Sequence, residues 1–260
     1  MNTKNKILAG LFSMVALFSS CNDFQEINED PNQVDESKVK PEWFLNASII
    51  GDQMNPEIAE RMFILTWNRA SRFNRGNGFT IGTDNNDYIT RYLSNDYAVK
   101  WLNQATKAVQ LGEKKVADGE ADLYPYYKNV IQMARIWRAY LNSEVSDGFG
   151  PIPALDAFSG VPGEYDSVDA IYTFILKELK EAEAALDPSI DMSPMSAEDA
   201  FYAGNVAKWK KYANSLRMRL AMRISAVDPA LAKAEFEDAA SKTFISEPTD
   251  IASVQEKEGW

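Results

Sequence analysis

The sequence has 260 residues, of which 45% are hydrophobic, 12% aromatic and 25% charged, a composition typical of a globular protein and not of a disordered chain. Its 27 basic and 38 acidic residues give a formal net charge of −11, which argues against nucleic acid as a partner. The chain has no histidine, the commonest general base and zinc ligand, so neither a histidine-dependent catalytic triad nor a metal or other cofactor is expected.

The N-terminal segment predicts export and a lipid anchor. Two lysines precede an apolar run over residues 7–18, which is shorter than the roughly 20 residues that a membrane-spanning helix needs. This layout is typical of a signal peptide. The run closes on LFSSC, where Cys21, the sole cysteine, follows small residues as in a bacterial lipobox, although Phe18 stands where leucine is usual. We therefore predict a signal peptide over residues 1–20 and lipid attachment at Cys21.

Residues 21–40 are polar and acidic and contain Pro31, which predicts a lipidated tether leading into the first helix. The acidic residues just after Cys21 have two interpretations. They are either solvated linker charges, or they resemble the acidic signal that sends some lipoproteins of Bacteroidota to the cell exterior.

From residue 41 onward, apolar residues recur at helical spacing. A break at residues 55–56 separates a first predicted helix from a second. Helical spacing resumes over residues 88–117 and again over 126–145, and the short polar turn between these segments predicts a helical hairpin. The first helix carries its predicted apolar face on Trp43, Phe44, Ala47 and Ile50.

Three more helices are predicted over residues 166–186, 205–224 and 229–241. Asp166 or Ser167 offers an N-cap oxygen to the first of them. The second carries six cations outside its apolar face. They suit either a phosphate-binding stripe or, as we favour in an acidic protein, a solvated face paired with carboxylates of the preceding helix. Paired helices of this length indicate an all-α fold of tetratricopeptide-like hairpins with long loops.

One segment interrupts the helices with two glycines and two prolines, SDGFGPIPALDAF at 146–158. It has no P-loop lysine and follows no predicted strand, so a phosphate site is not expected. The glycines allow a sharp turn and the prolines favour extended chain, so we interpret the segment chiefly as a structural turn. Ser146 and Asp147 are expected to cap this turn by bonding its exposed carbonyl and amide groups. A contact with a ligand or partner is the alternative interpretation.

Several of these segments together resemble one family. SDGFGPIP at 146–153, EYDSVDAIYTFILKELKEAEAAL at 164–186 and YAGNVAKWKKYANSLRMRLAMRIS at 202–225 resemble the SusD/RagB family of outer-membrane nutrient-binding lipoproteins, and FQEINEDPN at 24–32 and Cys21 fit it too. The resemblance implies a non-enzymatic lipoprotein, facing the cell exterior, that binds a glycan or related nutrient and delivers it to a SusC-like TonB-dependent transporter. Relatives are commonly much longer, so residues 41–260 are expected to form a helical domain that is incomplete at its C-terminus.

Within this framework the segment 67–92 is the candidate ligand site, because it combines aromatic residues with a long Gly/Asn-rich loop. Burial in the core competes with ligand stacking for each aromatic, and Phe73 and Phe79 are the better candidates because they lie in the loop itself. Residues 84–87 offer oxygens for calcium but lack the EF-hand spacing, and turn formation explains them as well. The candidate ligand-binding residues are Trp67, Phe73, Phe79, Tyr88 and Tyr92.

Two other functions remain open from the sequence. A helical-repeat lipoprotein can be an interaction scaffold whose groove takes a protein or peptide. A lipid-anchored glycoside hydrolase would need two facing carboxylates, and Glu144 and Asp147 are close in sequence near a predicted loop. Such pairs are common at helix ends, so catalysis is the less favoured hypothesis. Trp101, Trp137 and Trp209 lie on apolar helical faces and are predicted to be core residues.

Overall fold

The computed structural model describes residues 38–51, 93–161 and 163–254. By its internal contacts the chain divides into two units, Met1–Val39 and Lys40–Trp260, and every helix named below belongs to the second. Six α-helices lie in these described ranges: α3 (Pro41–Gly51), α7 (Asn103–Ala117), α8 (Tyr127–Phe149), α9 (Val168–Ala185), α10 (Val206–Arg223) and α11 (Pro229–Ala240). A π-helix, η4 (Leu93–Leu102), runs directly into α7, and short 3-10 turns are η5 (Glu120–Asp122), η6 (Ser193–Met195) and η7 (Pro248–Asp250).

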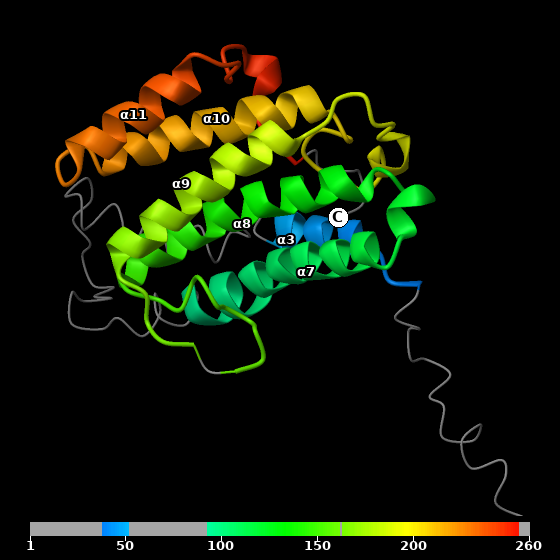
Figure 1. Cartoon of the computed structure of the whole chain (residues 1–260), viewed down its shortest axis with the longest axis horizontal. Coiled ribbons are helices and arrows are strands. Elements are labelled where there is room, and N and C mark those ends of the chain that lie inside the picture. Colours follow the sequence, from blue (N-terminus) through cyan, green and yellow to red (C-terminus); the bar gives the residue numbers. More distant parts are fainter. Residues whose placement is uncertain (1–37, 52–92, 162, 255–260) are drawn as a thin grey trace, which may run out of the picture. The chain divides into compact units, whose positions relative to one another are not determined.

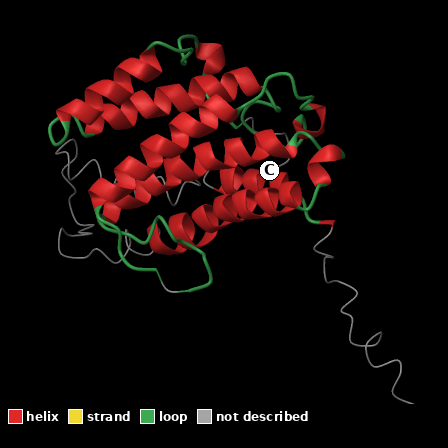
Figure 2. Cartoon of the chain, in the orientation of Figure 1, coloured by secondary structure: helices red, strands yellow, loops and turns green. Residues whose placement is uncertain are grey.

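The helices pack in the order in which they follow one another along the chain (Figure 1). α3 packs against α7 and α8, α8 lies between α7 and α9, and α10 lies between α9 and α11. From α7 to α11, successive helices run in opposite directions, as the predicted hairpins require. Figure 2 shows only helices and loops in the part of the chain that is described, which confirms the predicted all-α fold.

The hydrophobic core lies around α8 and on the faces of the neighbouring helices that pack against it. α8 buries side chains on more than one face because α3, α7 and α9 all pack against it. Trp101, Trp137 and Trp209 are buried, as predicted. The largest apolar side chains with almost no exposed surface are Leu45, Ile49, Met133, Ile136, Leu141, Ile171, Ile175, Leu176, Leu179 and Trp209.

Three helices begin at side-chain caps. The Ser167 hydroxyl accepts a hydrogen bond from the backbone N–H of Ala170 at 3.2 Å, so Ser167 is the cap of α9. Asn205 caps α10 in the same way. Asp228 caps α11, where Pro229 fills the first helical position and has no N–H to satisfy. The predicted starts of these three helices are confirmed to within a few residues.

The predicted apolar face of the first helix is wrong. α3 buries Leu45, Ser48 and Ile49, whereas Trp43 is 43% exposed and Ala47 is also exposed. A polar side chain can be buried when its hydrogen bonds are satisfied. The Ser48 hydroxyl accepts a hydrogen bond from the Trp137 indole N–H at 2.8 Å and donates one to the Trp101 carbonyl oxygen at 2.7 Å. These bonds turn the Ser48 face of α3 toward α8.

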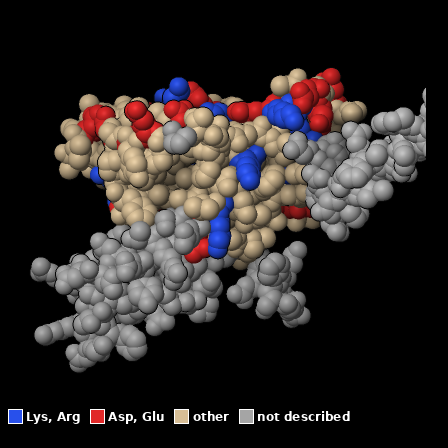
Figure 3. Space-filling view, turned by 90° about the horizontal axis from the view of Figure 1, so that it is seen from below, with Lys and Arg blue, Asp and Glu red and all other residues tan. Residues whose placement is uncertain are grey.

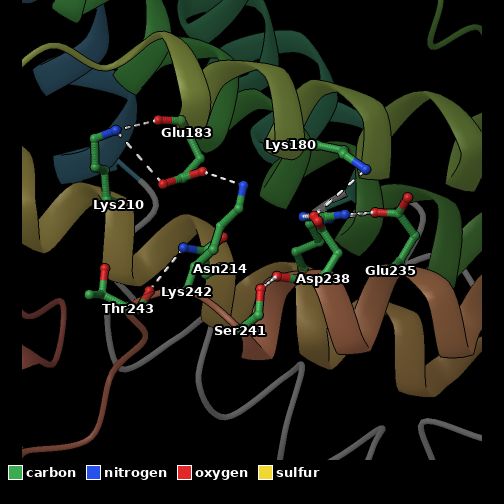
Figure 4. Close-up of polar contacts among 10 residues, drawn as sticks. Lys180, Glu183, Lys210, Asn214, Glu235, Asp238, Ser241, Lys242 and Thr243 are labelled. Carbon is green, nitrogen blue, oxygen red and sulfur yellow. Dashed lines mark hydrogen bonds and ion pairs between the residues drawn. The ribbon is translucent and has the colours of Figure 1, made fainter.

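The cations of α10 also differ from the prediction. Lys210 does pair with Glu183 of the preceding helix, at 3.7 Å, and Lys242 holds the same carboxylate at 2.8 Å (Figure 4). Arg217, however, is fully buried and pairs forward with Glu235 and Asp238 of α11. Helical spacing alone does not distinguish a buried cation from a solvated one, because the carboxylates that accept it belong to a later helix.

The predicted loop at 146–158 begins four residues later than expected. α8 continues through Ser146 to Phe149 and ends at Gly150, whose φ of +81° is readily adopted only by glycine. The Ser146 hydroxyl donates to the Gly150 carbonyl oxygen at 3.0 Å, so the predicted capping role of Ser146 is confirmed. Among the described helices none combines the length and the apolar character needed to cross a membrane.

Candidate ligand-binding surface

The residues that the sequence nominates for anchoring and binding lie outside the described part of the chain. These are Cys21 for lipid attachment and Trp67, Phe73, Phe79, Tyr88 and Tyr92 for ligand binding. The possible calcium ligands at 84–87 lie outside it as well. These assignments therefore stay predictions. Within the described ranges, no cluster of three or more carboxylate or cysteine side chains is arranged to hold a metal ion.

Exposed apolar side chains gather where α8 ends, α9 begins, α10 ends and α11 begins. We call this region the loop end. It carries eight of the fourteen large exposed hydrophobic residues in the described ranges: Phe149, Leu155, Phe158, Val161, Tyr165, Val168, Met222 and Val227. Contiguous exposed apolar surface often marks a binding site. The loop end is therefore the candidate ligand-binding surface of the described chain.

The α8–α9 loop, residues 150–167, is fastened at its base. The Asp166 carboxylate accepts hydrogen bonds from the backbone N–H groups of Ala154 and Leu155 at 2.8 and 2.9 Å. Ile152 forms an antiparallel bridge with Asp166, and the side chains of Ile152 and Ala154 are buried. The base of the loop is thus part of the core, while the side chains of Leu155, Phe158, Val161 and Tyr165 are exposed. Figure 1 shows this loop as the green segment that links α8 to α9.

The middle of the loop is held against α7. The Gln110 side-chain amide donates to the Phe158 carbonyl oxygen at 3.4 Å. Phe158 itself has a φ of +60°, which is uncommon for a residue other than glycine. Its ring remains 38% exposed, and Tyr165 is 76% exposed. Two aromatic side chains are therefore presented to solvent from a backbone with defined anchoring contacts.

The loop is free of positive charge. Residues 150–167 contain no lysine or arginine and three acidic residues, Asp156, Glu164 and Asp166. On α7, Lys107, Glu113 and Lys114 are exposed within four residues of Gln110, so this part of α7 carries charges of both signs. In the view from below the helices in Figure 1, the described surface is mostly uncharged, and many of its charged side chains gather along one edge (Figure 3). This surface suits ligands without strong negative charge.

A polar cluster lies beneath the loop end and joins three helices. The Tyr172 hydroxyl donates to the Asp147 carboxylate at 2.7 Å, and Arg223 pairs with the same carboxylate at 3.0 Å. Arg219 pairs with Glu144 at 3.2 Å. Burial raises the pKa of Glu144 even though Arg219 opposes the shift, and burial together with Asp147 raises the pKa of Tyr172 to about 12.

These contacts bear on the hydrolase hypothesis. A glycoside hydrolase needs two carboxylates that face each other across the scissile bond. Here Glu144 and Asp147 are each engaged by a different arginine of α10, so the pair ties α8 to α10. The prediction that Asp147 caps the turn is wrong, because its side chain turns toward Tyr172 and Arg223.

A shallow groove continues the loop end between α10 and α11. Its volume is about 240 Å³, and its lining is mainly apolar, with Phe236 and Met222 as the largest side chains. The groove is lined by Met222, Ser225, Pro229, Ala232, Lys233, Phe236 and Glu237. It adds apolar area to the loop end but supplies few polar groups that could orient a small ligand.

Sequence reasoning gave the α8–α9 loop mainly a structural role and kept ligand contact as the alternative. The structural part of that interpretation holds for residues 146–154, which end a helix and enter the core. The exposed aromatic residues beyond them were not singled out. The available signal was the presence of four large apolar residues, Leu155, Phe158, Val161 and Tyr165, in a segment whose prolines and glycines disfavour a helix.

Comparison with known proteins decides the family. The SusD-like family model, described as "Starch-binding associating with outer membrane", matches residues 28–258. The chain belongs to the SusD/RagB family. The predicted family is thereby confirmed, and so is the tetratricopeptide-like character of its helical fold.

Solved structures of SusD-like proteins share the fold over most of this chain. A chitin-binding protein is 23% identical with a TM-score of 0.68, and the match covers 82% of this chain and 45% of that protein. A SusD-like protein from Bacteroidetes, AC2a, is 28% identical with a TM-score of 0.63 and coverage of 84% and 40%. A SusD homolog from Parabacteroides distasonis is 27% identical with a TM-score of 0.64 and coverage of 85% and 41%.

The SusD/RagB chain studied here therefore spans less than half the length of these structures. No curated protein sequence matches it.

Proposed function

We propose that the protein binds a glycan or related nutrient at the outer membrane and presents it to a SusC-like TonB-dependent transporter. The observation that carries this proposal is the family match over residues 28–258, whose description names starch binding and association with the outer membrane. The aromatic loop end supports it, because sugar rings stack on exposed aromatic faces. Delivery to the transporter is what the resemblance to the SusD/RagB family implies.

The proposed binding surface has two parts. One is the segment containing Trp67, Phe73, Phe79, Tyr88 and Tyr92, where the sequence places aromatics in a Gly/Asn-rich loop. The other is the loop end, where the described structure exposes Phe158 and Tyr165. Recognition residues are commonly carried on loops that a rigid scaffold positions, and the helices supply that scaffold here.

We propose that binding proceeds without bond cleavage. The chain has no histidine, and Glu144 and Asp147 are engaged by Arg219 and Arg223. The family description likewise names binding and no reaction.

Native gel electrophoresis through polysaccharide tests the proposal. The purified chain without its signal peptide is run in gels that contain amylopectin or another candidate polysaccharide, with serum albumin as the reference that should not be retarded. We expect retardation by at least one polysaccharide, and no release of reducing ends from it between pH 5 and 8. Absence of retardation in every gel would refute glycan binding, and reproducible hydrolysis that copurifies with the protein would refute a pure binding role.

A further inference from the structure

Two aromatic side chains of the α8–α9 loop are available for contact. Tyr165 is 76% exposed and Phe158 is 38% exposed, whereas most aromatic side chains in folded proteins are largely buried. Leu155 and Val161 flank them in the same loop and are 45% and 69% exposed. The loop thus exposes an edge with four large apolar side chains to solvent.

The anchoring contacts of the loop restrict how this edge can move. Asp166 holds two backbone N–H groups at the base, and Gln110 holds the carbonyl of Phe158. Phe158 also has a positive φ, a backbone conformation that residues other than glycine rarely adopt. A backbone held in such a conformation needs surrounding contacts that fix it, and these contacts preorganise the aromatic edge for binding.

The charged residues around this edge of the loop determine whether a charged or an uncharged ligand is favoured. The loop carries Asp156, Glu164 and Asp166 and no cation. At this end of the helices, Arg219 and Arg223 pair with Glu144 and Asp147. Like charges brought together across an interface are disfavoured, so a polymer that carries carboxylate or sulfate groups is repelled. An uncharged polysaccharide meets no such repulsion, and Asp156 and Glu164 can accept hydrogen bonds from its hydroxyl groups.

We propose that the α8–α9 loop is a contact site for uncharged polysaccharide, with Phe158 and Tyr165 as stacking residues and the acidic loop residues excluding anionic polymers. The inference rests on the proposed function and deepens it, because it names the class of ligand and a second place where it binds. It adds to the aromatic segment at 67–92 and does not replace it.

The test compares loop variants with a matched control in the complete chain. Tyr165→Ala and Phe158→Ala each remove one stacking ring, while Tyr124→Ala removes an exposed tyrosine near the opposite end of α8. The probes are amylopectin as the uncharged polymer and polygalacturonate as the anionic polymer. We expect each loop variant to bind amylopectin about tenfold more weakly, which equals about 1.4 kcal/mol. Tyr124→Ala should bind like the unaltered protein, and thermal unfolding should show that all three variants are folded.

A charge reversal tests the exclusion of anions. The double variant Asp156→Lys with Glu164→Lys should gain retardation by polygalacturonate that the unaltered protein lacks. Amylopectin binding that survives both ring removals overturns the loop site and leaves glycan binding itself intact. Binding of polygalacturonate by the unaltered protein overturns the ligand class. Absence of binding to any polysaccharide refutes the proposed function and this inference with it. If the loop variants lose a copurifying membrane protein but keep amylopectin binding, the loop is a protein contact and the inference is wrong.

Discussion

Arg217 has no exposed side-chain surface, and its guanidinium pairs with the carboxylates of Glu235 and Asp238. Hydrogen bonding to this arginine lowers the pKa of Asp238, despite the opposing effect of burial. α11 buries few side chains of its own, chiefly Ala232 and Ala239. A large share of the attachment of α11 to α10 therefore comes from one buried cation.

Replacing Arg217 with methionine should destabilise the protein by about 3 kcal/mol, because removing one partner of a buried ion pair leaves the other charges uncompensated. The measurement is the free energy of unfolding in urea. Lys233→Met is the control, since Lys233 is 74% exposed and its contact with Glu237 is a long surface pair, expected to contribute under about 1 kcal/mol. Equal stability of the two variants would show that Arg217 is not a structural tie.

The sequence could place Arg217 on a helix but could not show that it is buried. Its spacing from Trp209 and Ala213 put it close to the apolar face, and charge made a solvated position the reasonable expectation. Ser48 was missed for the same reason, because its burial depends on hydrogen bonds to two tryptophans far along the chain. The periodicity of a sequence cannot predict the burial of a residue when that burial depends on partners far along the chain.

At the scale of helices, α8 and α9 are joined by a clamp of charges. Arg135 and Arg138 of α8 both bind the Glu178 carboxylate of α9, at 2.6 and 2.5 Å, and Arg135 also reaches Glu181 at 2.9 Å. Burial alone would raise the pKa of Glu178. The hydrogen bonds and charges of the two arginines outweigh burial, so its pKa is lowered.

This lowered pKa predicts how stability depends on pH. Folding favours the ionised form of Glu178, so its contribution is complete above the usual glutamate value of 4.5 and is lost as the pH falls through the lower folded value. The difference in unfolding free energy between the protein and Glu178→Gln should therefore be largest near pH 7 and shrink in acid. Urea unfolding across pH 3 to 7 measures it, with the more exposed Glu181→Gln as control. A pH-independent difference would contradict the clamp.

Helix periodicity recovered the order and ends of α9, α10 and α11, because their apolar stripes and caps are local in the sequence. It was less informative about the α8–α9 loop. There the outward position of Phe158 and Tyr165 follows from contacts with Asp166 and Gln110 that no local pattern reveals. The sequence therefore predicted the structural role of the loop, but it did not predict which of its side chains are exposed.

For the molecule as a whole, the family model matches residues 28–258, and the chain covers less than half of the longer solved domains that it resembles. We propose that residues 41–260 are the N-terminal part of such a domain, preceded by a signal peptide and a lipidated tether. Figure 3 shows acidic and basic side chains gathered along one edge of that view, so the charged residues of the described surface are unevenly distributed.

The proposed anchor makes a direct prediction. Cys21→Ala, expressed in a host that acylates lipoproteins, should move the protein from the detergent-extracted membrane fraction to the soluble fraction and abolish incorporation of labelled fatty acid. Buried acyl chains contribute about 0.8 kcal/mol per methylene, so their loss should release the protein almost completely. Protease added to intact cells tests separately whether the protein faces the exterior. Unchanged membrane partition of the variant would refute lipid attachment at Cys21.

The two ends of α8 have different neighbours. Near its start, the Tyr126 hydroxyl donates to Glu42 at the beginning of α3, where the chain arrives from the tether, and α8 ends at the aromatic loop. Its 23 residues separate these points by about 35 Å. Mechanical tension between an anchored N-terminus and a polymer held by the loop would thus run lengthwise along α8. α10 is tied to the loop end of α8 by Arg219 and Arg223, so part of such a load would pass through these two ion pairs.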